Sequence, residues 1–167
     1  MHDLELELCK SLHEDHMATL QLLERLETAL GPKHGSVPDA TSGDFRNLLT
    51  DLVTTMEAEV KGHYAFEEEH LFPRFAAEVN PAITEMLQGE HEIIRPIATQ
   101  ITELARAALK EGFTADGWDE FRKAGMEMVE REVFHVQKEE MGFLPALDEI
   151  LDEDEDRELN MAYLSAK

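Results

Sequence analysis

The sequence predicts an all-α protein in which two tandem helical hairpins pair to form a bundle. Three observations support this fold class: apolar side chains recur at helical spacing over long stretches, Gly and Pro interrupt those stretches, and beyond residues 3–8, where Leu and acidic residues alternate, no segment alternates as a half-buried strand does. With 167 residues, 43% of them hydrophobic, the chain is long enough for one core and too short for two. We therefore expect one domain over residues 1–167.

The first hairpin is expected to contain two long helices. The first runs from about Asp3 to Leu30 and ends at Gly31, which Pro32 follows. A polar loop rich in Gly, Pro and Ser spans residues 31–43. The second helix runs over about residues 44–72. On the first helix, one stripe contains Leu12, His16, Leu20 and Leu23. On the second, a stripe changes from apolar to polar side chains along the helix: Met56, Val60, His63, Glu67 and His70.

The second hairpin is expected to repeat this plan. Asn80 caps a third helix that begins with Pro81 and continues to about residue 111. A fourth helix covers about residues 115–143. A shorter helix over about residues 155–164 follows, and we expect it to pack on the bundle through Leu159, Tyr163 and Leu164.

One motif occurs twice, as residues 63–73 (HYAFEEEHLFP) and 135–145 (HVQKEEMGFLP). In each copy a His and a Glu stand four residues apart, which on a helix places them on one face, about 6 Å apart along the axis. Both side chains can then reach a common metal ion. Pro lacks an amide N–H and disfavours α geometry in the residue before it, so we expect Pro73 and Pro145 to end their helices.

A second correspondence strengthens the first. Asp15-His16 precedes the first copy by nearly the same interval as Glu90-His91 precedes the second. Pairing the two hairpins about a pseudo-twofold axis would bring the histidines and glutamates together inside the bundle. Burying such a set without a cation costs several kcal/mol, and a bound metal removes that cost. We therefore predict six metal ligands: His16, His63, Glu67, His91, His135 and Glu139.

A rival register exists, because Glu67-x-x-His70 and Glu132-x-x-His135 match the Glu-x-x-His spacing of ferritin-like di-iron bundles. The internal repeat argues against it. When the two motif copies are aligned, neither Glu-x-x-His pair is reproduced in the other copy. We expect His70 beside the site or at the surface.

Four further residues lie close to the predicted ligands in sequence. We place His13 beside the site or at the surface, since it stands one turn before His16. Glu68 and Glu140 point about 100° away from the glutamate ligands and are expected around the site or in solvent, with Glu140 as an alternative ligand. Arg95, one turn after His91, either orients a bound anion or pairs with an acidic surface residue, and we favour the pairing.

Imidazole and carboxylate without thiolate suit iron, manganese or zinc, and two carboxylates between two His pairs can bridge two ions. Two His per ion leave positions open on metals that prefer five or six ligands. An open, bridged pair is suited to binding or reducing O₂, peroxide or nitric oxide. Structural zinc is a weaker fit, because it prefers a closed tetrahedral set that usually contains Cys.

The charge balance bears on partners and location. Fifteen basic and 37 acidic residues give a net charge of −22, which opposes binding to nucleic acid or anionic membranes. We interpret the acidic run at residues 152–156 as a solvated helix start. Cys9 alone forms no intrachain disulfide, the N-terminus does not resemble a signal peptide, and no apolar run reaches membrane-span length. We expect a cytoplasmic protein.

The two motifs, with Leu-Phe-Pro73 and Phe-Leu-Pro145 after them and His16 and His91 before them, resemble those of the hemerythrin-like, or HHE cation-binding, domains over about residues 8–147. The resemblance implies an up-down-up-down four-helix bundle, here with a short C-terminal extra helix. It also implies two non-haem iron ions with a bridging oxo or hydroxo group. Glu67 and Glu139 would bridge the irons, while the paired terminal ligands would be His16 with His63 and His91 with His135.

The chain departs from the oxygen-carrying hemerythrins. The carriers place a second His one turn from the first on the third helix, where this chain has Leu87 and Arg95. Their last carboxylate lies five residues after its His, whereas Glu139 lies four after His135. We therefore predict a di-iron protein that binds or reacts with O₂, peroxide or nitric oxide, in sensing, iron handling or redox stress response. The alternatives are an enzyme that decomposes peroxide or reduces nitric oxide, a reversible oxygen carrier, and a metal-free helical scaffold.

Overall fold

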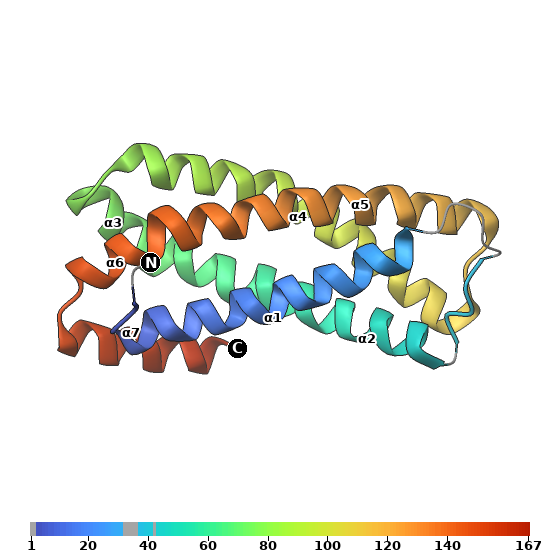
Figure 1. Cartoon of the computed structure of the whole chain (residues 1–167), viewed down its shortest axis with the longest axis horizontal. Coiled ribbons are helices and arrows are strands. Elements are labelled where there is room, and N and C mark those ends of the chain that lie inside the picture. Colours follow the sequence, from blue (N-terminus) through green and yellow to red (C-terminus); the bar gives the residue numbers. More distant parts are fainter. Residues whose placement is uncertain (1–2, 32–36, 42) are drawn as a thin grey trace.

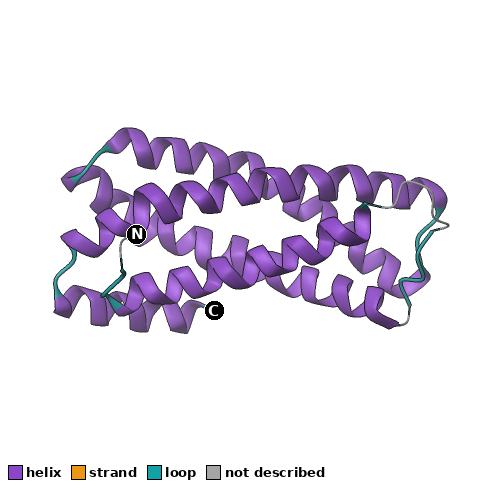
Figure 2. Cartoon of the chain, viewed as in Figure 1, coloured by secondary structure: helices purple, strands orange, loops and turns teal. Residues whose placement is uncertain are grey.

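The structure, a computed structural model, describes residues 3–31, 37–41 and 43–167, so residues 32–36 and 42 of the predicted polar loop lie outside the described residues. Within them, all regular secondary structure is helical, which confirms the all-α prediction (Figures 1 and 2). None of these helices is both long enough and apolar enough to cross a membrane. The elements are, in chain order, α1 (Glu7–Leu30), α2 (Gly43–Ala58), η1 (Glu59–Tyr64), η2 (Glu67–Leu71), α3 (Phe72–Glu78), α4 (Pro81–Glu111), α5 (Ala115–Lys138), η3 (Glu139–Phe143), α6 (Leu144–Ile150) and α7 (Glu153–Ala166), where η denotes a π-helical stretch.

The long helices lie side by side in an elongated bundle (Figure 1). α1 packs against α2 and α5, and α4 packs against the same two helices, so these four surround a common interior. α7 lies along α1 at one end of the bundle. Each helix turns an apolar face inward, as the helical spacing of its apolar residues requires.

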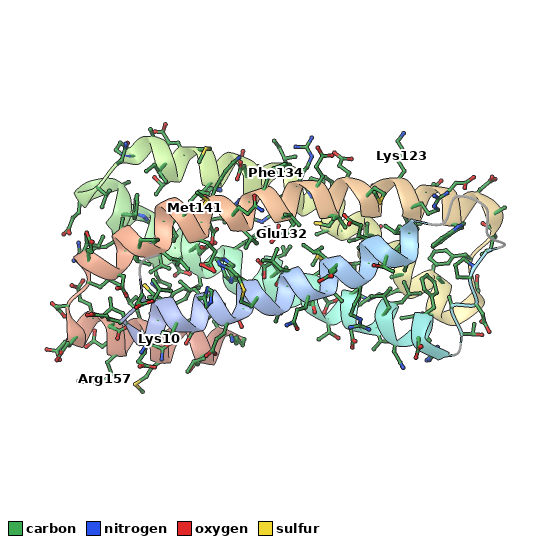
Figure 3. All side chains as sticks on the ribbon, viewed as in Figure 1. Lys10, Lys123, Glu132, Phe134, Met141 and Arg157 are labelled. Carbon is green, nitrogen blue, oxygen red and sulfur yellow. The ribbon has the colours of Figure 1, made fainter. Side chains whose placement is uncertain are left out.

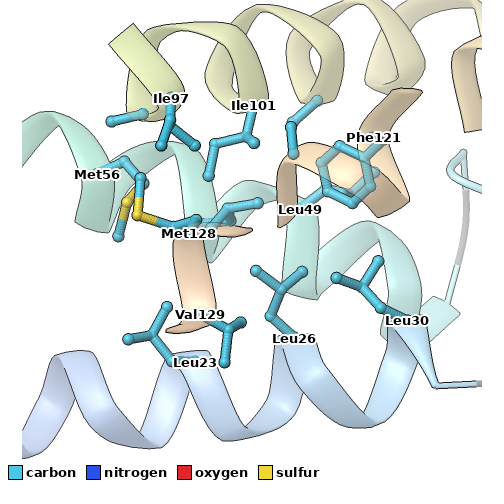
Figure 4. Packing of buried hydrophobic residues seen from close by; sticks show 14 of the residues in the cluster. Leu23, Leu26, Leu30, Leu49, Met56, Ile97, Ile101, Phe121, Met128 and Val129 are labelled. Atoms are coloured by element: carbon cyan, nitrogen blue, oxygen red, sulfur yellow. The ribbon is translucent and has the colours of Figure 1, made fainter. Parts of the chain in front are cut away.

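The buried apolar side chains form two clusters. The larger, which includes Leu23, Leu49, Ile101 and Phe121, fills the end of the bundle shown in Figure 4. The smaller includes Leu12, Leu71, Leu87 and Phe143. On each long helical segment the predicted ligands lie between residues of the two clusters. They therefore form a polar layer between two apolar ones.

The second hairpin begins its helices where the sequence predicted. The Asn80 side chain accepts a hydrogen bond from the Ala82 N–H at 2.8 Å, and α4 starts at Pro81. The Thr114 hydroxyl accepts one from the Gly117 N–H at 3.0 Å, and α5 starts at the next residue after Thr114. Such caps satisfy N–H groups that have no partner within the helix.

The predicted start of the first helix at Asp3 was wrong, since α1 begins at Glu7. The N–H groups on either side of this start are satisfied by carboxylates from the other end of the chain instead of by an earlier helical turn. Asp148 accepts from the Leu6 N–H at 2.9 Å, and Asp156 accepts from the Leu8 N–H at 2.8 Å. The extended backbone before α1 is therefore held by long-range contacts.

The prediction that Pro73 and Pro145 end their helices was also wrong. Each Pro instead lies in the first turn of a further helix, α3 or α6. A π turn precedes each one: the Phe72 N–H donates to the Glu67 carbonyl, five residues back, and Leu144 donates to Glu139 in the same way. This wider turn relieves the clash between the proline ring and the preceding turn, so the chain stays helical.

The C-terminal helix was predicted at about residues 155–164 and spans Glu153–Ala166. Tyr163 is buried and Leu159 partly buried, as expected, but Leu164 is 50% exposed because it points about 100° away from Tyr163. The acidic run does start the helix, through a capping box between Asp152 and Glu155. The run is not wholly solvated, because the side chain of Asp156, which contacts the start of α1, is only 7% exposed.

Candidate metal centre

The structure brings all six predicted ligands together in the polar layer. They come from every side of the bundle, and each is at most 3% exposed. Both glutamates stand where the helix widens into a π turn, since η2 begins at Glu67 and η3 begins at Glu139. The positions of the four histidines are His16 on α1, His63 on η1, His91 on α4 and His135 on α5.

Glu139 faces all four imidazoles. Its Oε2 atom lies 2.9 Å from Nε2 of His16 and 3.7 Å from Nε2 of His63. Its Oε1 atom lies 2.8 Å from Nε2 of His135 and 3.8 Å from Nε2 of His91. One carboxylate oxygen is thus directed at each histidine pair.

The two carboxylate oxygens of Glu67 are likewise directed at different histidine pairs. Oε2 lies 3.4 Å from Nε2 of His63, and Oε1 lies 3.4 Å from Nε2 of His91. The donor atoms form two close sets, in each of which all atoms lie within 4.8 Å of one another. The sets are Glu67, His91, His135 and Glu139, and His16, His63 and Glu139.

The donor atoms also leave hydrogen-bonding capacity unused. Although the Nε2 atoms of His16 and His135 approach Glu139 at 2.9 and 2.8 Å, no hydrogen bond of acceptable geometry from the described residues reaches either carboxylate oxygen of Glu67 or of Glu139. The buried Nε2 atoms of His16 and His63 likewise make none. Buried polar atoms without partners cost free energy, and carboxylates cost most. Cations between the two histidine pairs would satisfy these atoms, so the residues present fit a metal centre with two positions.

The outward-facing Nδ1 atoms of one histidine pair are held directly by carboxylates. Nδ1 of His91 lies 2.6 Å from Glu68, which Arg95 also contacts at 2.6 Å. Arg95 therefore pairs with an acidic residue, the favoured alternative from the sequence. Nδ1 of His135 lies 2.8 Å from Glu90, whose other oxygen contacts a Lys side chain. Neighbours of this kind fix the orientation of a ligating imidazole.

The other histidine pair has weaker outward contacts. Nδ1 of His16 lies 3.7 Å from Glu140, which also contacts His13. Nδ1 of His63 lies 3.1 Å from the hydroxyl of Tyr163, which in turn donates a hydrogen bond to an Asp carboxylate. Glu140 thus stands behind an imidazole rather than among the inward-facing donors.

The electrostatics of the metal-free site favour protonated imidazoles. Burial by itself lowers the pKa of each His, but the nearby carboxylates outweigh burial. The pKa is raised to about 9 for His16, to about 9 for His91 and to about 11 for His135, in each case with Glu139 as a main cause. The pKa of Glu139 is lowered well below its ordinary value, because His135 outweighs its burial. Protons thus occupy the place that cations would take.

The two residues that only the rival register would add, His70 and Glu132, lie outside both donor sets. The His70 side chain is 39% exposed, and its Nε2 atom lies 3.8 Å from the carboxylate of Glu69. Glu132 points into the bundle, unlike Phe134 and Lys123 on the same helix (Figure 3), but it accepts a hydrogen bond from Tyr64. Burial and the nearby charge of another buried acid raise the pKa of Glu132 to about 8.

Sequence reasoning missed the aromatic and acidic surroundings of the ligands. Tyr64 stacks on His91, with 3.8 Å between ring centroids and 9° between ring planes. The acid beside Glu132 is Glu59, which is 5% exposed and accepts a hydrogen bond from Thr19 at 3.4 Å. The available signal was the position of Glu59, one helical turn before His63, where it interrupts an apolar stripe.

A comparison with protein-family models finds a match over most of the chain. The family model described as the hemerythrin HHE cation-binding domain matches residues 8–147, which include all six predicted ligands. A search of curated proteins found no match to the chain.

Proposed function

The chain belongs to the hemerythrin HHE cation-binding domain family, and from this membership we propose that it binds two non-haem irons and, through them, O₂, peroxide or nitric oxide. The observation that supports the proposal is that each of the two glutamate carboxylates is shared between the two histidine pairs. Glu67 and Glu139 each direct one oxygen at each histidine pair. A carboxylate so placed offers one oxygen to each of two metal ions.

The proposal gives each buried residue a role. His16 and His63 would hold one iron, His91 and His135 the other, and the two glutamates would bridge them. An oxo or hydroxo group would complete the bridge. A pair of bound irons supplies one electron from each ion, which suits small oxidants and nitric oxide.

The third helix supports reactivity in preference to reversible oxygen carriage. At the positions one turn from His91, Leu87 is fully buried in an apolar cluster and Arg95 is engaged with Glu68. Neither offers a further donor. Four protein donors to each iron would leave coordination positions open for a small ligand, which is consistent with sensing, iron handling or redox stress response.

The proposal includes an up-down-up-down course for four long helical segments. The order of the buried residues along each segment supports it. α1 runs from the smaller apolar cluster to the larger, and α2 with η1 and η2 runs from the larger to the smaller. α4 then runs toward the larger cluster, and α5 with η3 runs back toward the smaller. Outside this unit, α7 forms the short C-terminal helix.

We also propose that the protein works in the cytoplasm and that its partner is a small ligand, with neither nucleic acid nor membrane involved. The net charge of −22 supports the absence of polyanionic partners. The thiol of Cys9 is buried and unpaired among the described residues, which suits a reducing compartment.

The test is to reconstitute metal-free protein with ferrous iron without oxygen, measure bound iron, and mix the reduced protein with O₂ or peroxide in a stopped-flow instrument. We expect two irons per chain, rapid oxidation with near-ultraviolet charge-transfer absorption, and azide binding to the oxidised form. A single tightly held zinc, or no bound metal, would end the di-iron proposal. A stable oxygenated form that releases O₂ under vacuum would instead show reversible carriage.

A further inference from the structure

The contacts behind the four histidines follow the internal repeat of the sequence, with one exception. Each motif copy supplies the carboxylate for a histidine of the other hairpin: Glu68 faces His91, and Glu140 faces His16. Glu90, which precedes His91, faces His135 directly. By the same symmetry, the carboxylate that precedes His16 should face His63.

That carboxylate belongs to Asp15, and a residue of α7 stands between it and His63. The Tyr163 hydroxyl lies 3.1 Å from Nδ1 of His63 and donates its proton to Asp15. The other oxygen of Asp15 accepts from Lys167 at 2.9 Å. Tyr163 is 1% exposed, and its ring meets that of His63 edge-on at 5.8 Å. This phenol is therefore built into the site, although it lies beyond the family match at residues 8–147.

The two histidine pairs consequently differ as donors. A carboxylate that accepts a hydrogen bond from a ligating imidazole raises its basicity and strengthens its bond to a metal. His91 and His135 both have such carboxylates, at 2.6 and 2.8 Å. For His63 the acceptor is a neutral phenol, and for His16 the carboxylate stands at 3.7 Å, beyond hydrogen-bonding distance.

We propose that the two metal positions are unequal, with the His91/His135 position binding iron more tightly than the His16/His63 position, and with Tyr163 of α7 as the positioning residue that orients His63. The inference rests on the proposed di-iron function and adds the order in which the positions fill. The His91/His135 position fills first. The iron at the His16/His63 position is the one that leaves first.

The experiment is an anaerobic titration of metal-free protein with ferrous iron, monitored by calorimetry, on the unmodified chain and on two matched variants. Tyr163→Phe keeps the ring and removes the hydroxyl, while Glu90→Gln removes the carboxylate charge at the symmetry-related place. In the unmodified chain we expect two separate binding steps. Tyr163→Phe should weaken the second step roughly 10- to 100-fold and leave the first unchanged, and Glu90→Gln should weaken the first.

A second readout assigns the positions without measuring affinity. In protein half-loaded with iron-57, the Mössbauer doublet should change in Glu90→Gln and stay the same in Tyr163→Phe. Thermal unfolding of the metal-free variants measures the structural share of the effect, which is the loss of the hydrogen bond from Tyr163 to Asp15. A general loss of stability would weaken both binding steps, whereas loss of the orientation of His63 weakens only the second.

The outcomes separate the two claims. Fewer than two irons bound to the unmodified chain would overturn the proposed function itself. Two irons bound with equal affinity, or a second step that Tyr163→Phe leaves unaltered, would overturn the inequality while the di-iron function stands. If Tyr163→Phe fails to fold, the Mössbauer comparison still tests the inequality. The same doublet in the half-loaded unmodified chain and in half-loaded Glu90→Gln would overturn it.

Discussion

Glu67 and Glu139 lie across the same two histidine pairs, each with one oxygen toward each pair. The corresponding distances from Glu67 are 3.4 Å to Nε2 of His63 and 3.4 Å to Nε2 of His91. Under the proposed function, removing one histidine should therefore affect one metal position, whereas changing either glutamate should affect both. This difference gives the first prediction.

Glu139→Gln should remove most of both irons, because the amide keeps the shape of the side chain but lacks its charge and offers one acceptor oxygen in place of two. Glu140→Gln is the matched control, since Glu140 is the next residue and contacts His16 only from its outer side. Iron analysis after gel filtration measures the effect. Retention of one full equivalent of iron by Glu139→Gln would contradict its place between the two positions.

His63→Ala and His135→Ala should each lose much of the iron, because each removes a donor from one of the two close donor sets. His70→Ala should retain it, since that side chain lies at the surface and belongs to neither set. Iron content of the three variants after identical reconstitution is the measurement. Loss of iron in His70→Ala, with iron kept in His63→Ala, would restore the ferritin-like register.

Local sequence signals predicted a large part of this arrangement. The caps at Asn80 and Thr114 act within their own helices, so the starts of α4 and α5 could be read from neighbouring residues. The repeated motif predicted the six residues that meet in the polar layer, because helical spacing alone places His and Glu four residues apart on one face.

The features that local sequence signals did not predict depend on contacts between residues that are far apart in the sequence. α1 begins late because Asp148 and Asp156 accept its first N–H groups, and nothing near residue 7 signals this. The contact of Tyr163 with His63 likewise joins residues that are 100 positions apart. The continuation of the helix through Pro73 required a π turn, whose hydrogen bonds leave no periodic mark in a stretch this short.

The metal-free protein should lose stability as the pH rises above about 6.5. The pKa is raised to about 9 for His16 and His91 and to about 11 for His135, from an ordinary value of 6.5, so protonated imidazoles stabilise the fold fully below pH 6.5. That contribution is lost as the pH rises through these values. Urea unfolding at pH 6, 7.5 and 9 tests the direction, and stability that increases over this range would contradict it.

Iron binding should show the opposite dependence on pH, because metal ions and protons compete for the same imidazole nitrogens. At pH 7 the raised pKa values of His16, His91 and His135 mean that binding displaces protons. Calorimetric titrations in buffers of different ionisation enthalpy measure the number released. Binding that releases no protons at pH 7 would show that these histidines are already neutral.

Asp156→Ala should destabilise the protein by about 1–3 kcal/mol, since it removes the carboxylate that accepts the Glu7 and Leu8 N–H groups and leaves the buried one unpaired. Asp154→Ala is the control: it lies in the same first turn of α7, but its side chain is 87% exposed. Urea unfolding of the metal-free proteins compares the two. Equal losses would mean that the effect comes from the charge at the start of α7.

The cap on α1 also has a consequence for the order of events during synthesis. Leu8 is made early, and its acceptor Asp156 follows 148 residues later. The first turn of the helix that carries His16 therefore gains its cap only after α7 has been made and has docked beside it. We expect the growing chain to remain unable to trap iron in a half-built centre, so that iron is captured in a single late event when donors from both hairpins are already present.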